Sequence, residues 1–194
     1  MNLSSRWCVT AVVALAALGC SDPVPPPAQG AFTARITSVS PAPTGKSCPS
    51  GASFAYDVPD VPDTMPTEEL TPFNYSHKIV DGEPDSAVSC KVSGQGSFFE
   101  GRIAFSGKSL EIRSGSLGAD LKGTARITVG NSQKLSTTLL SPSANCKIDA
   151  KADGNRLEVA PGHIWATFDC PSVESPPSDY CAAKGTFVLE NCDK

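Results

Sequence analysis

Six of the eight cysteines carry the clearest chemistry in this chain of 194 residues. An even set of cysteines in an exported chain is typical of disulfides, whereas a zinc site needs closely spaced pairs or accompanying histidines. No C-x-x-C occurs, and the chain has only His77 and His163. We therefore predict no metal site and three disulfides among Cys48, Cys90, Cys146, Cys170, Cys181 and Cys192.

The pairing of these thiols is open, since six cysteines can combine in many ways. Local geometry suggests one arrangement. The proline-rich stretch PSVESPPSDY separates two strand-like segments and is predicted to be a loop, with Cys170 and Cys181 at its two ends. We expect a bridge at the base of this loop, which closes a short segment of chain. The expected pairs are Cys170–Cys181, Cys48–Cys90 and Cys146–Cys192.

Side chains for acid–base or nucleophilic catalysis are few and scattered. A Ser-His-Asp triad needs an activated serine, and neither His77 nor His163 lies in a nucleophile motif. Glu100 and Glu111 are a possible glycosidase pair, but any exported β-protein carries such acids, so the pattern is not specific. The G-x-S-x-G, H-E-x-x-H and phosphate-loop motifs do not occur. We predict no catalytic residue and no cofactor.

An acidic, proline-rich stretch spans residues 57–72, DVPDVPDTMPTEELTP. Carboxylate oxygens suit calcium, but calcium loops wrap their ligands around a glycine turn, and this stretch has no glycine. We expect a long surface loop that includes one helical turn at MPTEEL, with a calcium site as the alternative.

The N-terminal segment indicates where the protein resides. Arg6 precedes an apolar stretch from Val9 to Gly19, which is about half of the roughly 20 residues that span a bilayer. A basic start, a short apolar core and small residues at its end are typical of a secretory signal peptide. We predict that residues 1–19 are this signal and that cleavage leaves Cys20 as the first residue.

The cleavage site resembles the lipobox of bacterial lipoproteins. That motif ends in Gly or Ala followed by Cys, as Gly19 and Cys20 do, while Ala17 and Leu18 depart from its first two positions. The resemblance implies that Cys20 carries a diacylglyceryl group and an acyl chain such as palmitate, which together give a stable membrane anchor. It also implies the outer membrane, because Ser21 stands where Asp would signal retention at the inner membrane.

Ordinary secretion is the alternative for this segment. Cleavage after Ala14-Leu15-Ala16 would leave Cys20 as a plain thiol. The residues that follow favour the lipid, because SDPVPPPAQG is typical of an extended, semi-rigid spacer between a membrane and a domain. The prediction is a lipidated tether over residues 20–30 and a single domain over residues 31–194, which is long enough to bury a sizeable core.

Short alternating segments recur along residues 31–194. They are rich in Val, Ile, Thr and Phe and are separated by Gly, Ser, Asn or Asp, as in AFTARITSV and HIWATFDC. Asp153-Gly154 favours a tight hairpin between two of them. We predict an all-β fold, an antiparallel β-sandwich or barrel-like domain stapled by disulfides, with Trp165, Phe168 and Phe187 in its core. A ligand-stacking role for Trp165 and Phe187 is the alternative.

Charge and composition limit the function classes. The net charge of −4 argues against nucleic acid or an anionic lipid surface as the partner, so contact with the membrane is expected through the lipid anchor. The first hypothesis is a non-enzymatic lipoprotein that binds an envelope protein or polysaccharide, or has a structural role. The alternatives are an exported hydrolase acting on envelope polymers and a disulfide-stapled inhibitor that presents residues 171–180.

The two ends of the chain carry a second resemblance. The string IWATFDCP…CAAKGTFVLENC, with the lipobox and the proline-rich spacer, is similar to a class of uncharacterised Cys-rich lipoproteins from myxobacteria and related soil bacteria. This resemblance implies a lipoprotein with a β domain and carries no activity.

The anchor and the bridged thiols predict one intact mass. Protein extracted from native membranes and alkylated without reduction should begin at Cys20, carry two or three acyl chains and take up no alkyl label. A mass that begins elsewhere, lacks acyl chains or includes labelled thiols would contradict this prediction.

Overall fold

The computed structural model describes residues 24–49, 54–59, 77–150, 152–153, 156–157 and 159–194. These residues form strands and turns without a helix, which confirms the all-β prediction. The strands in this part of the chain are β1 (Gln29–Ser38), β2 (Phe54–Val58), β3 (Ile79–Val80), β4 (Ser86–Ser93), β5 (Phe98–Phe105), β6 (Lys108–Leu117), β7 (Lys122–Asn131), β8 (Leu139–Leu140), β9 (Cys146–Ala150), β10 (Ala152–Asp153), β11 (Arg156–Leu157), β12 (Val159–Ala160), β13 (His163–Ser175) and β14 (Asp179–Glu190).

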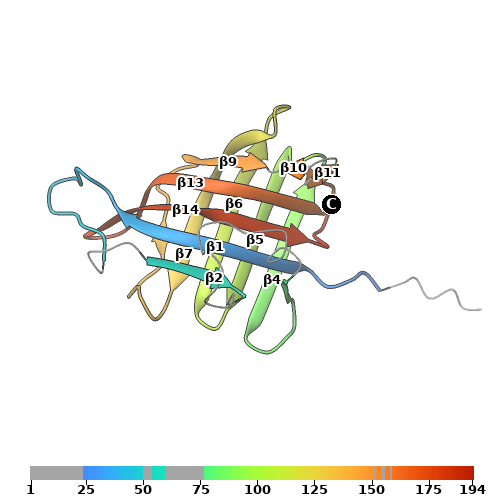
Figure 1. Ribbon diagram of the computed structural model, residues 1–194, viewed down its shortest axis with the longest axis horizontal. Helices are drawn as coiled ribbons and strands as arrows, with labels where there is room; N and C mark the ends of the chain where they lie inside the picture. The colour runs from blue at the N-terminus through green and yellow to red at the C-terminus, as the bar shows by residue number, and fades with distance from the viewer. Residues whose placement is uncertain (1–23, 50–53, 60–76, 151, 154–155, 158) are drawn as a thin grey trace, which may run out of the picture.

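Twelve strands form one antiparallel sheet that folds over into two layers. The order is β2-β1-β14-β13-β8-β7-β6-β5-β4, with β3 beside β1 and β12 beside β13. In Figure 1, β2, β1, β14 and β13 cross the picture in front, and β4 to β7 run steeply behind them. β9 pairs with β13 on one side and β7 on the other, so it joins the two layers. The sandwich is therefore one continuous sheet.

The alternation of apolar and polar residues in the sequence places them on opposite faces of each strand. In β9, Ile148 is buried between the exposed Lys147 and Asp149. The hairpin predicted in this region is confirmed, because β10 pairs with β11 antiparallel, although Asp153 is the last paired residue of β10, opposite Arg156, and not part of the turn. Between β7 and β9, the chain forms only the two-residue strand β8.

The loop predicted at residues 171–180 is wrong for most of its length, because these residues largely belong to the β13–β14 hairpin. β13 continues to Ser175 and β14 begins at Asp179, so the reversal of the chain takes place over residues 176–178. A bulge between Cys170 and Val173 shifts the register and allows the hairpin to continue. The prolines fall in the bulge and in the turn, where a missing N–H is tolerated, so they do not end the strands.

All six cysteines beyond residue 40 are bridged, as predicted, but the three expected pairings are wrong. Because the hairpin is longer than expected, Cys170 lies opposite Ala183 and Cys181 lies opposite Val173. The two thiols are therefore at different levels of the ladder, and each bonds to a cysteine from another part of the chain. The disulfides are Cys48–Cys181, Cys90–Cys192 and Cys146–Cys170.

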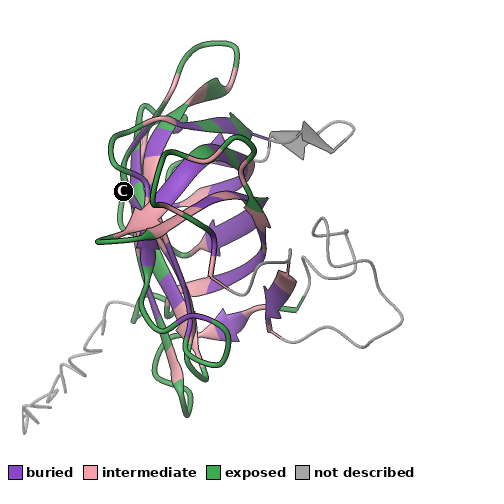
Figure 2. Cartoon of the chain, turned by 90° about the vertical axis from the view of Figure 1, so that its left-hand side faces the viewer, coloured by how far each residue is buried: buried purple, intermediate pink, exposed green. Residues whose placement is uncertain are grey.

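The core lies between the two layers, and Figure 2 shows buried residues along their facing sides. Phe32, Phe168 and Phe187 from the front layer and Phe99 from the back layer are almost completely buried. The Phe99 and Phe187 rings stack across the core with their centroids 6.3 Å apart. The core positions predicted for Phe168 and Phe187 are confirmed, and so a stacking role in ligand binding is not available to Phe187.

Trp165 is also buried, as predicted, but it belongs to a separate cluster. Its side chain is 4% exposed and packs with Ala31 and Val188 instead of with the phenylalanines. Val188 on β14 pairs with Ala31 on β1 and with Trp165 on β13. Phe187, its neighbour on β14, faces the main core. Because neighbouring residues on a strand point to opposite faces, Trp165 lies on the outer side of the front layer.

The edge of β4 is covered by the C-terminal segment. The Val92 N–H donates to the Asp193 carbonyl at 2.8 Å, and the Asp193 N–H donates to the Cys90 carbonyl at 3.0 Å. The Gly162 N–H donates to the Val92 carbonyl at 3.0 Å. An uncovered edge strand invites pairing with other chains, and these hydrogen bonds, together with the Cys90–Cys192 disulfide, occupy the edge at residues 90–92.

The disulfides should contribute to stability in proportion to the chain they close. The Cys48–Cys181 pair is separated by 133 residues and the Cys146–Cys170 pair by 24. The chain-entropy model assigns about 5 kcal/mol to the first bridge and about 3 kcal/mol to the second. We expect the Cys48→Ala/Cys181→Ala variant to lose more free energy of unfolding in urea than Cys146→Ala/Cys170→Ala. The reverse order would contradict this prediction.

Candidate functional site

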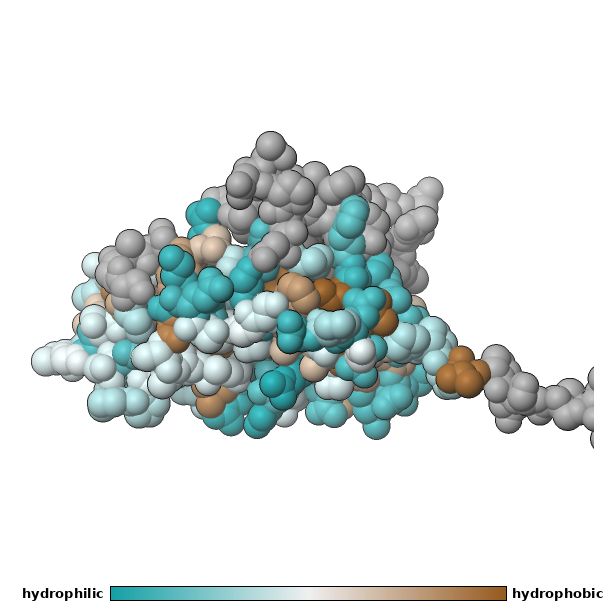
Figure 3. Space-filling model, turned by 90° about the horizontal axis from the view of Figure 1, so that it is seen from below, coloured by the Kyte–Doolittle hydropathy of each residue, from teal (hydrophilic) through white to brown (hydrophobic). Residues whose placement is uncertain are grey.

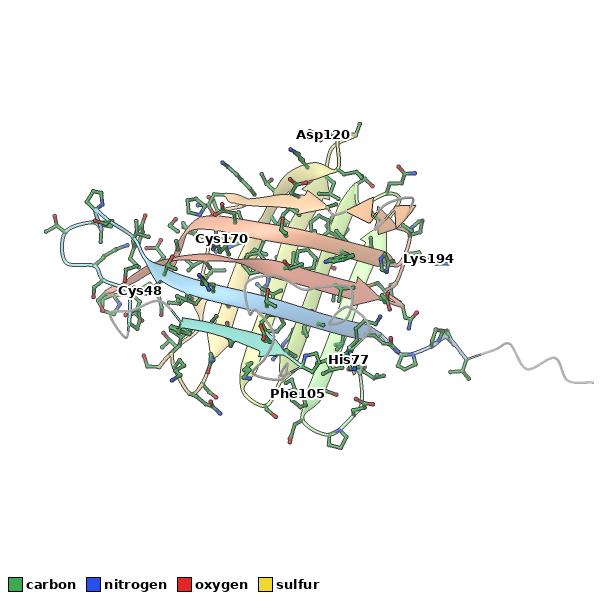
Figure 4. The ribbon with its side chains drawn as sticks, in the orientation of Figure 1. Cys48, His77, Phe105, Asp120, Cys170 and Lys194 are labelled. Atoms are coloured by element: carbon green, nitrogen blue, oxygen red, sulfur yellow. A yellow bond between two sulfur atoms is a disulfide. The ribbon has the colours of Figure 1, made fainter. Side chains whose placement is uncertain are left out.

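The end of the domain at which β1 begins also holds the C-terminus. Gln29 begins β1 directly opposite Glu190, and the Asn191 side-chain amide donates to the Pro27 carbonyl at 3.0 Å. Figure 1 shows the N-terminal segment leaving the domain at this end, and Figure 4 places Lys194 there. Cys20, the predicted lipidation site, and the predicted signal lie outside the described residues.

A cavity of about 610 Å³ at this end contains one of the two histidines. His163 Nδ1 lies 3.3 Å from Glu190 Oε1, and Lys78 Nζ lies 2.8 Å from Glu190 Oε2. The other described lining residues are Pro25, Pro26, Pro161, Gly162, Asn191, Cys192, Asp193 and Lys194. Since none of the described lining residues supplies a serine hydroxyl or a free thiol, His163 and Glu190 have no nucleophile beside them here.

Neither His77 nor the described part of the acidic stretch belongs to an assembled site. His77 is exposed and is not among the residues that line the His163 cavity. Residues 60–76, which hold most of the possible calcium ligands and the expected helical turn, lie outside the described residues. In the described part of the chain, no group of three or more His, Cys, Asp or Glu side chains is arranged to hold a metal ion. No helix among these residues is long and apolar enough to span a bilayer.

The opposite end of the domain is a cross-linked tip. We use this name for residues 39–48 together with the end of the β13–β14 hairpin, residues 174–181. The Cys48–Cys181 disulfide joins these two segments, and Figure 4 shows Cys48 at the end of the molecule away from Lys194. The Ser47 N–H donates to the Ser178 carbonyl at 2.9 Å, and the Tyr180 N–H donates to the Ser47 carbonyl at 2.9 Å. Covalent and backbone bonds therefore hold the two segments together.

Lys46 adds a third kind of contact within the tip. Its ammonium forms a salt bridge with the Glu174 carboxylate and lies 5.4 Å from the centre of the Tyr180 ring. Both charged side chains are about one-third exposed or less, at 33% and 26%. A half-buried cation held by a carboxylate and an aromatic ring restrains the loop against the hairpin.

A polar groove crosses the outer face of β4, β5 and β6 in the back layer. It encloses about 470 Å³. Lys91 on β4 lies opposite Glu100 on β5, and Arg102 on β5 lies opposite Glu111 on β6. Its other lining residues are Ser89, Cys90, Gly101, Ile112, Arg113, Ser114 and Asp193. The groove therefore combines cations and carboxylates on a pleated floor.

The structure thus brings the two possible glycosidase carboxylates, Glu100 and Glu111, into one groove. The Glu111 carboxylate is engaged by Arg113, whose Nη2 lies 2.6 Å and Nε 2.8 Å from Glu111 Oε1. The alternation of residues along β5 is enough to predict from the sequence that Glu100 and Arg102 face solvent. Which residues of β4 and β6 lie beside them is known only from the strand register.

Tyr56 is the described group whose pKa departs most clearly from its ordinary value, and it belongs to the core. Burial raises the pKa of its hydroxyl, and the backbone of Gly130 acts in the opposite direction. The ring packs edge-on against Phe32 at 5.8 Å between centroids and stacks with Phe54 at 6.1 Å. A perturbed pKa can mark a functional site, but here burial between layers accounts for it.

The chain was compared with protein-family models, with curated proteins and with solved structures, and no match was found in any of the three comparisons.

Stability at high pH should report on Tyr56. Because burial raises its pKa, the unfolded chain loses the phenol proton first, near pH 10. The stabilising effect is present below that pH and is lost as the pH rises, by at most about 1.4 kcal/mol per pH unit. We expect the free energy of unfolding in urea to fall less steeply above pH 10 in Tyr56→Phe than in the wild type. Equal slopes would contradict the assignment.

Proposed function

We propose that this protein is a lipid-anchored domain of the bacterial cell envelope, at the outer membrane, that binds a partner protein through its cross-linked tip and has no enzymatic activity. The membrane is reached through the lipid on Cys20. The tip then points away from the bilayer.

One observation carries this proposal: residues 24–28, the described part of the predicted tether, and the tip lie at opposite ends of the same strands. Gln29 pairs with Glu190 at the tether end of β1, and Ser38 pairs with Cys181 at the tip. The ten residues of β1 separate the two ends by about 30 Å. A fully extended, proline-rich segment of the length of residues 20–28 could span up to roughly 28 Å. The tip can therefore stand well above the headgroups on a rigid support.

The construction of the tip supports a binding role. Preorganised loops bind with a smaller entropic cost than flexible ones, and the tip is restrained by a disulfide, two backbone hydrogen bonds and the Lys46–Glu174 salt bridge. Pro176, Pro177 and Ser178 at the turn are exposed. Functional residues often occur on loops that a rigid scaffold positions.

An inhibitor module is the second candidate function. The same turn favours it, since Pro176 and Pro177 project from a hairpin that is cross-linked to a neighbouring loop. A protease inhibitor presents such a restrained segment to its target. Inhibition of a protease from a broad panel at micromolar concentration, lost on reduction of the disulfides, would favour this narrower function over general partner binding.

The partner site is tested by photo-crosslinking in intact cells. A benzoylphenylalanine placed at Ser178 in the full chain should give a defined crosslinked species. The same group at Asp120 should not, because this exposed residue lies in the β6–β7 turn, away from the tip. Equal crosslinking from both positions, or none from Ser178, would contradict binding through the tip.

The anchor is tested separately in the same cells. The wild type should fractionate with the outer membrane and Cys20→Ser should not mature as a lipoprotein. If the wild-type protein lacks acyl chains but still gives the Ser178 crosslink, the proposed anchor is wrong and the proposed binding through the tip is retained.

A further inference from the structure

We propose that the polar groove on β4, β5 and β6 is a second binding site, whose ligand is an acidic glycan, a sugar chain that carries carboxylates as well as hydroxyls. The groove lies on the outer face of the back layer and shares no residue with the cross-linked tip. The inference therefore does not depend on the tip or on its partner.

The cations of the groove provide the first argument. Among the described residues, Lys91 and Arg102 are exposed and form no salt bridge within 4.0 Å. Arg113 does have a partner, the Glu111 carboxylate at 2.6 Å. A guanidinium without a carboxylate partner can donate two parallel hydrogen bonds to a carboxylate of a ligand. Arg102 and Lys91 are thus available to bind ligand carboxylates.

The carboxylates of the groove provide the second argument. Glu100 lies directly opposite Lys91 and two residues from Arg102 on the same face of β5. It has no salt bridge with a described residue and is exposed. A carboxylate accepts hydrogen bonds from hydroxyl or N–H groups. A ligand that satisfies both Arg102 and Glu100 must therefore combine an anionic group with donors, as an acidic sugar does.

An exposed aromatic ring extends the same face. Phe98 is 38% exposed and, among the described residues, the one large aromatic side chain on the surface. Phe98, Glu100 and Arg102 alternate with buried or half-buried residues along β5, so all three point outward. Two residues along a strand span about 7 Å. A sugar ring can pack its C–H face on Phe98 while its neighbour reaches Glu100.

The position of the groove disfavours other ligands. A peptide that recognises a sheet through its backbone needs a free strand edge, but β5 is paired with β4 and β6 on its two sides. The nearby edge of β4 is occupied at residues 90–92 by the C-terminal segment. An apolar ligand would have to desolvate the charged side chains that form most of the lining. Recognition on this face must come from side chains that bind polar groups.

The direct test measures binding of defined sugars to the full-length protein in detergent micelles, with its disulfides intact. The probes are oligogalacturonate fragments, dextran fragments of the same length without carboxylates, and poly-L-glutamate as a carboxylated chain without sugar rings. Isothermal titration should detect oligogalacturonate, with affinity that falls as salt is raised, since the groove is exposed. Dextran and poly-L-glutamate should bind at least tenfold more weakly.

Substitutions locate the site. Arg102→Ala should raise the Kd for oligogalacturonate about tenfold, because it removes a charged hydrogen-bond donor. Phe98→Ala and Glu100→Gln should raise it about threefold to fivefold. The matched controls are Lys184→Ala and Asp169→Asn, which remove exposed charges from β14 and β13 in the front layer and should leave the Kd unchanged.

Four results would overturn the proposal. They are no heat of binding with oligogalacturonate at millimolar concentration, equal affinity for poly-L-glutamate, loss of affinity in the controls as large as in Arg102→Ala, and release of new reducing ends from the probe. The last result would identify a hydrolase that uses Glu100 and Glu111 instead of a binding site. Urea unfolding of each variant distinguishes lost binding from lost folding.

Discussion

The antiparallel β13–β14 hairpin is the constraint on which the rest of the structure depends. β14 lies between β13 and β1, so its register sets the position of both neighbours. Each of the three disulfides has one cysteine on this hairpin or just after it. A slip of one residue would turn Phe187 out of the core and bring Val188 in, because side chains alternate between faces. Correct pairing of the last strands therefore fixes the core and the cross-links together.

This hairpin also separates the two ends of the molecule. At one end, Glu190 meets the start of β1 and contacts Lys78 and His163. At the other end, Cys181 holds the loop that contains Lys46. A continuous sheet of long, hydrogen-bonded strands bends little along the strand direction. It therefore keeps its two ends at a nearly fixed distance. Among the described residues, these paired strands alone keep residues 24–28 and the tip apart.

The two layers differ in what their outer faces offer. In the front layer, Trp165 and Val188 are buried on the outer side. In the back layer, Arg102 and Glu100 are exposed and line a groove. A binding protein can use such surfaces without a deep pocket, because function depends on groups placed on the fold and not on the fold itself. The proposed binding sites are therefore separate: the groove lies on the outer face of the back layer, and the tip lies at one end of the domain.

The sequence alone determined the all-β class, the bridging of the six cysteines after residue 40 and the burial of Phe168, because alternation and cysteine count are local properties. The signal and the tether stay predictions from the sequence. Only the tertiary structure decided which cysteines pair, since the bulge after Cys170 extends the hairpin past a proline-rich segment that by composition resembles a loop. It alone placed Arg102 beside Glu111 and Lys46 beside Glu174. These neighbours depend on strand register and on the folding of the sheet into two layers, and alternation along one strand contains neither.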